Sequence, residues 1–497
     1  MLALTKQPLQ SQIAREPSSQ EINVLLDMFR QGRFAETETA ARAMTVRYPQ
    51  HGFGWKAMGT ALLQQGRAEE ALLPLRKVIE ITPADAQLHN NLGNTFAQLN
   101  RMPEAETSYR QAIRLDPGFV AAYHNLGNIF LKLGRLQEAE ASYRRALELN
   151  PELADAHYNL GNTLKNQVRL NEAEACYKRA LELRPNFAGA HNNLGVILYD
   201  QGRFAEAEFS YHQALKTEPG NVDAHYNLGN TLKKQGKIEA AAACFRSCLE
   251  IDPQDRLGAR LLLAALGFEP MPLRASEAHL EAFYVTKAVA WDKVVDQSQK
   301  YFGAKLVAQT LLSHADKPGK LDILDAGCGT GQVGLLVHDR ANRLDGVDLS
   351  ASMLEKAREK AIYNNIYLTD LESFMRDHTA QYDAITCAAT LIHFGDLSPV
   401  FNAAATCLRD DGLFVFTVFK NENEQDDVAV SPLDGLAKSG CYAHGKNYIT
   451  RLAEASGFTV EALSTEIHEY RLDVDHDAPI MCFVVALRRR PGVASLT

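Results

Sequence analysis

The amino-acid sequence predicts a multidomain protein in which an all-helical repeat array precedes an α/β domain. One observation is a pattern that recurs every 34 residues through the N-terminal half of the chain. A second is a short apolar strand at 321–326 that runs directly into a glycine-rich loop. A third is length, because 497 residues exceed what one hydrophobic core usually serves.

Residues 1–17 are expected to form a mobile leader, because they lack the basic start and apolar run of a secretory signal. No apolar stretch approaches the ~20 residues that a membrane-spanning helix needs. The eight cysteines form no CxxC pair and show no metal-ligand spacing, so we expect neither a metal site nor a disulfide framework. These features favour a cytoplasmic protein without a membrane partner.

The net charge of −9 is unevenly distributed. Residues 1–275 carry 31 Lys and Arg against 30 Asp and Glu, whereas residues 276–497 carry 21 against 31. An acidic C-terminal domain repels a phosphate backbone. We therefore expect no nucleic-acid partner.

Residues 18–255 divide into seven units of 34 residues, each with a proline in the same place. The prolines are Pro49, Pro83, Pro117, Pro151, Pro185, Pro219 and Pro253. Within the unit at 120–153, Leu126 and Phe130 lie on one face of a first helix, which Gly134 ends. Ala139 and Tyr143 repeat at helical spacing on a second helix. Each unit is thus predicted to be a packed helix pair.

This pattern resembles the tetratricopeptide repeat. Such units bury their apolar faces by stacking, so the resemblance implies a superhelix with a concave groove. After the last unit, residues 256–275 are expected to form a capping helix and a linker that contains Pro270 and Pro272.

One column of asparagines is not required for packing, and asparagine is a mediocre helix former. It comprises Asn91, Asn125, Asn159, Asn193 and Asn227, with further asparagines one turn on at 94, 128, 162 and 230. The column is similar to the asparagine ladder of O-linked N-acetylglucosamine transferases, which implies that it binds the backbone of an extended polypeptide in the groove. An amide offers both a donor and an acceptor to a peptide bond. The alternative is that these side chains link adjacent helices or face solvent.

Residues 276–497 are expected to form the α/β domain. LDILDAG at 321–327 is suited to a buried parallel strand, and it leads into Gly327, Gly329 and Gly331. Glycines at a strand-to-helix turn let a ligand approach bare backbone. LDGVDLS at 344–350 predicts a second strand that ends at Asp348, whose carboxylate can accept hydrogen bonds from ribose hydroxyls. Further strands are predicted at 367–371, 382–389, 412–419, 458–463 and 482–488, the last one antiparallel.

The order Asp-x-Gly-x-Gly-x-Gly in this block resembles the Rossmann-like class I S-adenosylmethionine-dependent methyltransferases. A nicotinamide-binding domain is the weaker alternative, because no second nucleotide-binding half follows. The resemblance implies S-adenosylmethionine as cofactor. The cofactor-binding residues that it implies are Asp325, Gly327, Gly329, Gly331, Asp348, Asp370 and Leu371, with residues 388–391 lining the same site.

The methyl acceptor cannot be identified from the sequence. If the acceptor has a proton to lose, a base would help, and His393 and His444 are the candidate catalytic residues. Residues 420–447 are expected to form a lid over the acceptor. The alternative function is an interaction scaffold whose methyltransferase-like domain is inactive, but the intact glycine loop and Asp348 favour an enzyme.

Most of the chain also resembles bacterial proteins that join these repeats to a methyltransferase domain. The sequence departs from them at 283–295, where it has FYVTKAVAWDKVV in place of a Tyr-rich stretch. Tyr284, Trp291 and Tyr301 are the aromatic residues that could cover the cofactor there.

Overall fold

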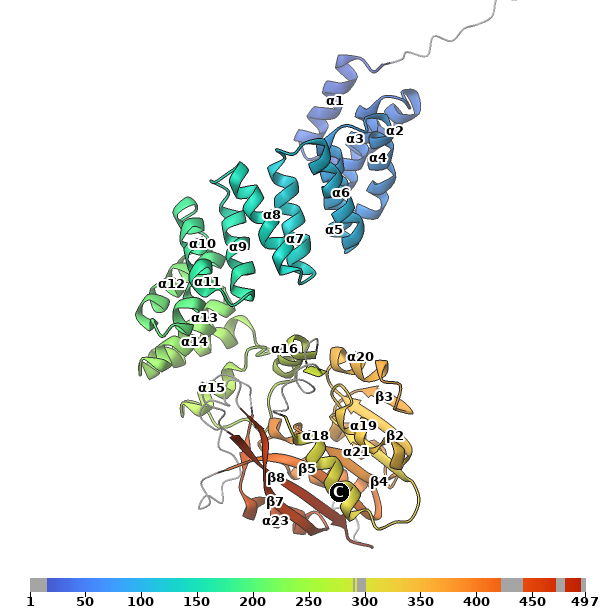
Figure 1. Ribbon diagram of the computed structural model, residues 1–497, viewed down its shortest axis with the longest axis vertical. Helices are drawn as coiled ribbons and strands as arrows, with labels where there is room; N and C mark the ends of the chain where they lie inside the picture. Colours follow the sequence, from blue (N-terminus) through green and yellow to red (C-terminus); the bar gives the residue numbers. More distant parts are fainter. Residues whose placement is uncertain (1–15, 289–290, 293–300, 422–440, 471–478, 493–497) are drawn as a thin grey trace, which may run out of the picture. The chain divides into compact units, whose positions relative to one another are not determined.

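The computed structural model describes residues 16–288, 291–292, 301–421, 441–470 and 479–492 (Figure 1). Most of the predicted leader and most of the predicted lid lie outside these residues. The chain divides into two compact units, residues 1–219 and 220–497.

In the first unit, the described helices follow one another in antiparallel pairs, as the 34-residue period predicts (Figure 1). They are α1 (Ser19–Arg30), α2 (Phe34–Arg47), α3 (Gly52–Gln64), α4 (Ala68–Ile81), α5 (Ala86–Gln98), α6 (Met102–Leu115), α7 (Val120–Lys132), α8 (Leu136–Leu149), α9 (Ala154–Asn166), α10 (Leu170–Leu183), α11 (Ala188–Asp200) and α12 (Phe204–Thr217).

Four successive pairs, from α5–α6 to α11–α12, depend on a glycine that faces a tyrosine ring. A Cβ added at Gly161 of α9 would lie 2.7 Å from the ring of Tyr177 on α10, which is closer than such atoms approach. The same contact recurs in the neighbouring repeats between Gly127 and Tyr143. These tyrosines are completely buried. The small residue therefore sets how closely the two helices approach.

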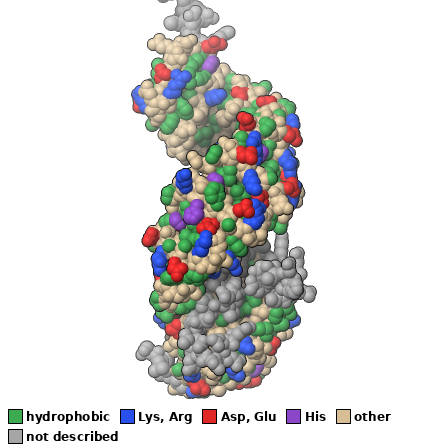
Figure 2. All heavy atoms as spheres, turned by 90° about the vertical axis from the view of Figure 1, so that its left-hand side faces the viewer, with side chains coloured by type: hydrophobic (Ala, Val, Ile, Leu, Met, Phe, Trp, Pro, Cys, Tyr) green, Lys and Arg blue, Asp and Glu red, His purple; other side chains and the backbone are tan. Residues whose placement is uncertain are grey.

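A ladder of ion pairs joins successive repeats on their surface. Arg169 contacts Glu140 of the preceding repeat at 2.7 Å and Glu172 of its own at 2.7 Å. Arg135 and Arg203 stand at the corresponding positions and make equivalent pairs. Figure 2 shows acidic and basic side chains intermixed over the helices of the face in view. Exposed pairs are individually worth little, but a repeated network also fixes register.

The second unit starts with one more helix pair and continues into an α/β domain. The described helices are α13 (Val222–Lys234), α14 (Ile238–Ile251), α15 (Ala259–Ala265), α16 (Glu277–Ala288), α18 (Gly303–His314), α19 (Gln332–Val337), α20 (Ala351–Glu359), α21 (Leu371–Asp377), α22 (Ser398–Cys407) and α23 (Lys446–Ala455). The described strands are β1 (Leu321–Ala326), β2 (Ala341–Asp348), β3 (Asn365–Leu368), β4 (Tyr382–Cys387), β5 (Leu408–Lys420), β6 (Ala443–His444), β7 (Phe458–Tyr470) and β8 (Pro479–Arg489).

The strands form one sheet in the order β3-β2-β1-β4-β5-β8-β7, with β6 beside β5. The first five strands run parallel, and β8 lies antiparallel between β5 and β7, as expected from the sequence. Helices α21, α22 and α23 cover one face of the sheet, while α18 and α19 cover the other. The chain reverses its direction across the sheet between β1 and β4, where such sheets bind ligands.

Two element boundaries differ from the sequence prediction for identifiable reasons. The strand expected at 367–371 ends at Leu368, because Asp370 accepts a hydrogen bond from the backbone N–H of Ser373 and so begins α21. The capping helix starts only at Ala259, after Gly258 with φ +74°. Glycine tolerates this left-handed conformation, which breaks the helix that the apolar pattern suggests.

The segment 272–275, which we call the strap, is built into the α/β domain. The carbonyl of Leu273 accepts backbone hydrogen bonds from Gly395 at 2.7 Å and Asp396 at 3.0 Å. The hydroxyl of Tyr442 donates to the carbonyl of Pro272 at 3.0 Å. Part of the predicted linker therefore serves as an edge of this domain.

Among the described residues, no helix is long and apolar enough to cross a membrane. The same residues contain no group of three or more His, Cys, Asp and Glu side chains that could hold a metal ion.

We predict that Gly161→Ala destabilises the repeats although alanine is the better helix former. Overpacking against Tyr177 costs ~1–3 kcal/mol, whereas the gain in helix propensity is at most ~1 kcal/mol. The free energy of unfolding, measured in urea, should fall by about 1 kcal/mol. Gly220→Ala is the control, because its Cβ would meet nothing within 4 Å. Equal stability of the two variants would contradict the packing argument.

A second prediction concerns where the α/β domain begins. A fragment of residues 270–497 should be more stable than one of residues 276–497, because the shorter fragment lacks the strap. Loss of three or more net hydrogen bonds should lower the free energy of unfolding by about 3 kcal/mol. Denaturation of both fragments measures this difference, and coincident midpoints would show that the strap contributes nothing.

Candidate cofactor and acceptor cavity

The glycine loop joins β1 to α19 and runs close to the neighbouring strand. Gly327, Gly329 and Gly331 all have positive φ, at +75°, +53° and +89°. A Cβ at Gly327 would lie 2.1 Å from the hydroxyl oxygen of Thr390, so only glycine fits there. A Cβ at Gly329 would meet nothing within 4 Å. The loop therefore packs tightly on one side and leaves bare backbone beside open space on the other.

Asp348 ends β2 next to this loop. Its carboxylate accepts backbone hydrogen bonds from Gly329 at 2.9 Å and Ser350 at 2.8 Å. Burial raises the pKa of Asp348 above its ordinary value, while these two N–H donors act in the opposite direction. The carboxylate is thus fixed by backbone at the end of a parallel strand, with remaining lone pairs for a ligand.

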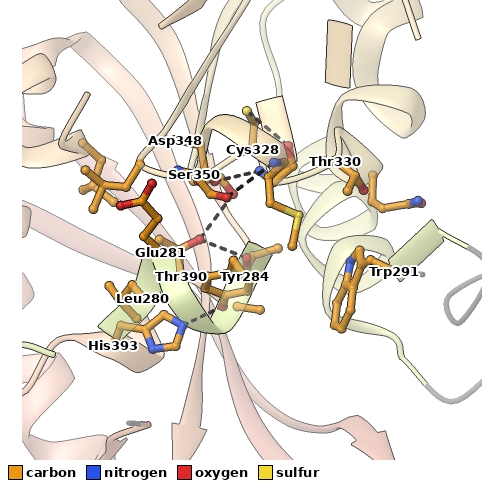
Figure 3. Close-up of a pocket in the computed structure, with 18 of the residues that line it drawn as sticks. Leu280, Glu281, Tyr284, Trp291, Cys328, Thr330, Asp348, Ser350, Thr390 and His393 are labelled. Carbon is orange, nitrogen blue, oxygen red and sulfur yellow. Dashed lines mark hydrogen bonds between the residues drawn. The ribbon is translucent and has the colours of Figure 1, made fainter. Parts of the chain in front are cut away.

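A cavity of about 1050 Å³, partly open to solvent, lies at the carboxyl ends of β1, β2 and β4. The predicted residues that line it are Gly327, Gly329, Asp348, Leu371, Ala388, Ala389, Thr390 and His393. Figure 3 shows Asp348 beside the loop residues Cys328 and Thr330, with Tyr284 and His393 at the other end.

Asp325 and Asp370 do not line the cavity. Asp325 is fully buried, and it accepts hydrogen bonds from Tyr363 at 2.6 Å and Thr386 at 3.0 Å. Burial raises its pKa to about 6. Asp370 caps α21 and contacts Arg274 of the strap at 3.1 Å. Both carboxylates therefore hold the walls of the cavity in place.

Gly331 also lies outside the lining, where it begins α19 in the left-handed conformation. Its Cβ would approach the ring of Tyr363 to 3.1 Å. Gly331 thus forms the turn into α19 on the side that faces Tyr363 and not the cavity.

The two candidate bases are separated by the structure. His393 lines the cavity from the short turn after β4. His444 is fully buried in β6, does not line the cavity, and stacks on Tyr448 with 5.9 Å between ring centroids. Burial lowers the pKa of His444 to about 4. Only His393 is placed to meet a substrate.

Helix α16 supplies a wall that the glycine motif alone did not indicate. Leu280, Glu281 and Tyr284 of α16 line the cavity, and so do Trp291 and Tyr301. The three aromatic residues proposed from the sequence therefore all reach the site. The departure at 283–295 from the related pattern was the only sequence signal for this wall.

Asp292 holds the end of this segment against the glycine loop. Its carboxylate accepts hydrogen bonds from Gln332 at 2.9 Å and Lys360 at 2.7 Å, and another from the hydroxyl of Thr330. The ammonium group of Lys360 also donates to the carbonyl of Thr330 at 2.6 Å. No sequence motif pointed to Asp292, because its partners come from distant segments.

In the repeats, the asparagine column links each repeat to the one before it. The amide nitrogen of Asn159 donates to the side-chain oxygen of Asn128 at 3.0 Å, and that oxygen also accepts from Tyr143 at 2.7 Å. Asn193 bonds Asn162 in the same way at 2.8 Å. Asn125 repeats the arrangement with Asn94. These asparagines therefore link helices of adjacent repeats, which is the alternative that the sequence left open.

The two ends of the column differ from its centre. Asn91 accepts a hydrogen bond from Gln87 of its own helix at 2.8 Å. Asn227 follows a repeat that has Val196 where the others have the second asparagine. Among the described hydrogen bonds, the regular Asn-to-Asn link is made by Asn125, Asn159 and Asn193.

Comparison with known proteins agrees with both parts of the chain. Residues 323–412 match the model of a methyltransferase domain, and residues 59–168, 154–187, 176–209 and 198–266 match models of tetratricopeptide repeats.

Two curated relatives are O-methyltransferases by name. The malonyl-[acyl-carrier protein] O-methyltransferase of Acetivibrio thermocellus is 34% identical over 119 residues, which cover 23% of this chain and 42% of the relative. The ubiquinone biosynthesis O-methyltransferase of Aeromonas salmonicida is 30% identical over 164 residues, which cover 30% of this chain and 68% of the relative.

Among solved structures, the tetratricopeptide-repeat protein YrrB, described as having an unusual peptide-binding site, is 28% identical. It covers 36% of this chain and 93% of its own, with a TM-score of 0.33. The pilF protein of Pseudomonas aeruginosa is 23% identical and covers 41% of this chain and 92% of its own, with a TM-score of 0.38.

The glycine loop, Asp348, the strand order and the match to the methyltransferase-domain model together identify the domain after the repeats as Rossmann-like. The chain belongs to the methyltransferases, as a fusion of tetratricopeptide repeats with a methyltransferase domain.

Proposed function

We propose that this protein transfers a methyl group from S-adenosylmethionine to an acceptor, and that its repeats bind a protein or peptide partner. The observation that carries the first part is the cavity in which bare backbone at Gly329 meets the fixed carboxylate of Asp348. The cysteine thiols suit a reducing compartment, so a cytoplasmic location is part of the proposal.

The residues present fit this cofactor. Open space beside Gly329 leaves room for a chain against backbone, and Asp348 can accept hydrogen bonds from a pair of ribose hydroxyls. Leu371 and Ala388 supply apolar surface. When bound, the sulfonium supplies an already activated methyl group, so the protein mainly has to orient the acceptor and exclude water. Trp291 and Tyr284 line the cavity from the α16 side, where their rings exclude water.

We expect the purified protein to bind S-adenosylmethionine, and Asp348→Ala to weaken binding by about 10-fold or more. The reason is the loss of paired hydrogen bonds in a desolvated site. Calorimetric titration measures the dissociation constant. Asp339→Ala is a matched control, because the side chain of Asp339 is 98% exposed. Titration with NAD tests the nicotinamide alternative.

Tight NAD binding without a response to S-adenosylmethionine would refute the proposal. Binding of neither ligand by a folded protein would favour the interaction scaffold with an inactive domain.

For the repeats, the amide network supports binding of an extended polypeptide. In the interior of the column, the nitrogen of Asn159 is directed to the preceding repeat, and its side-chain oxygen has no partner among the described contacts. Conversely, the oxygen of Asn128 accepts two bonds, which leaves its nitrogen as a donor. Each such pair offers one acceptor and one donor, the complement of a peptide unit.

Replacing Asn125, Asn159 and Asn193 together by Ala should weaken peptide binding by several kcal/mol, at ~0.5–1.5 kcal/mol for each hydrogen bond. Fluorescence anisotropy with a labelled library of short unstructured peptides measures the change. Stability should alter little, because the lost links between repeats are offset by the better helix propensity of alanine.

The control replaces polar side chains of the second helices, Thr107, Gln111 and Asn171, by Ala. Equal peptide affinity of the two folded triple variants would mean that the column serves packing alone.

A further inference from the structure

Tyr284 and His393 meet inside the cavity although 109 residues separate them in the sequence. The Tyr284 hydroxyl lies 2.6 Å from Nε2 of His393, and the two rings are edge to face at 5.6 Å. Figure 3 shows the pair pointing toward one another at the end of the cavity away from Asp348. The strap holds the histidine, because Ala275 donates its backbone N–H to the His393 carbonyl at 3.0 Å.

From this pair, and on the basis of the proposed methyl transfer, we infer that Tyr284 and His393 form a proton relay that ionises a hydroxyl acceptor. The substrate class is then a neutral alcohol or phenol, and not a carboxylate. Tyr284 is the catalytic residue that touches the acceptor, and His393 is the final proton acceptor.

The chemistry of the two side chains assigns these roles. Burial raises the pKa of Tyr284 well above its ordinary value, so the phenol keeps its proton at neutral pH and cannot itself be the resting base. Its O–H can donate to the lone pair on Nε2 of His393, which leaves lone pairs on the tyrosine oxygen to accept a proton from the substrate. A phenol between a substrate and an imidazole thus passes a proton on without carrying a charge.

The step balances in atoms and electrons. The acceptor oxygen bonds to the methyl carbon while the carbon–sulfur bond breaks, and the electron pair of that bond stays on sulfur. The acceptor proton moves to the oxygen of Tyr284, and the proton of Tyr284 moves to Nε2 of His393. The products are a methyl ether, a neutral thioether and an imidazolium, which returns its proton to water when the products leave.

The charge of the cavity lining argues against a carboxylate as the acceptor. Among the described residues that line the cavity, three have carboxylate side chains, namely Glu277, Glu281 and Asp348. Arg274 is the one Lys or Arg among the described lining residues, and it is already paired with Glu277 at 2.8 Å and Asp370 at 3.1 Å. A carboxylate acceptor would be repelled, and it would have no proton for the relay to remove.

The first test uses 4-nitrocatechol, whose absorbance reports whether its hydroxyl is ionised. It is titrated with the full-length protein in the presence of S-adenosylhomocysteine, at a pH where the free probe is mostly neutral. We expect binding to the wild type to raise the ratio of ionised to neutral probe about 10-fold or more. Tyr284→Phe and His393→Ala should bind the probe without this change.

The matched control is Tyr382→Phe. Tyr382 is a buried tyrosine of the same domain that donates to Asp345 at 2.8 Å and does not line the cavity. Its variant should ionise the probe as the wild type does. A wild-type protein that leaves the probe neutral, or a Tyr284→Phe variant that still ionises it, would overturn the relay.

A second test compares the cost of Tyr284→Phe for two acceptors by following S-adenosylhomocysteine formation. Turnover of catechol should fall by ~10²–10⁴, the usual contribution of acid–base catalysis. Turnover of 4-nitrocatechol should fall much less, because its hydroxyl ionises near neutral pH without help. Equal losses for both would assign the pair a structural role and overturn the inference.

Benzoate serves as the carboxylate probe. Its methylation in preference to catechol, or no methylation of either catechol by a protein that binds S-adenosylmethionine, would overturn the assigned substrate class. Failure to bind S-adenosylmethionine at all would instead refute the proposed function.

Discussion

Four of the repeats depend on the close contact between a glycine of the first helix and a buried tyrosine of the second. At Gly127 no Cβ can fit against the ring of Tyr143, so the two helices are held at one separation. The same tyrosine then uses its hydroxyl on Asn128, and Asn128 in turn accepts from Asn159 of the next repeat. One packing contact thereby orients two amides. A shift of the ring would disturb the helix pair and the polar ladder together.

In the methyltransferase domain, the comparable constraint is the approach of Gly327 to Thr390 across β1 and β4. It places the glycine loop against the end of β4, close to the turn that carries His393. The strap binds that turn from outside through Leu273 and Ala275. The site is therefore assembled from the glycine loop, which is a local sequence motif, and from wall segments that come from distant parts of the sequence.

This division explains what the sequence could and could not reveal. The 34-residue period, the loop after β1 and the strand pattern are local features, and they were sufficient for both folds, for the antiparallel last strand and for the position of Asp348 and Gly329 at the cavity. The role of Asp325 was not accessible, because its burial depends on Tyr363 and Thr386, which arrive from other strands and turns. A carboxylate beside a glycine loop looks the same in sequence whether it faces a ligand or the core.

The two histidines illustrate the same limit more sharply. Both follow parallel strands in sequence, yet His393 lines the cavity and His444 is enclosed next to Tyr448. What separates them is the approach of α16, because only His393 meets a side chain from that helix, at the Tyr284 hydroxyl. Two residues that are 109 positions apart and meet once in the fold produce no periodic pattern in the sequence.

The two proposed binding surfaces require different kinds of selectivity. Amide groups recognise the backbone of a polypeptide and are nearly indifferent to its side chains, so the column can supply affinity but little discrimination between partners. The cavity has the opposite character, since a hydroxyl that fails to reach Tyr284 leaves buried polar groups unpaired. Under the proposed function, selectivity for the acceptor therefore has to reside in the cavity, and binding of a partner by the repeats would raise the local concentration of the molecule that carries the acceptor.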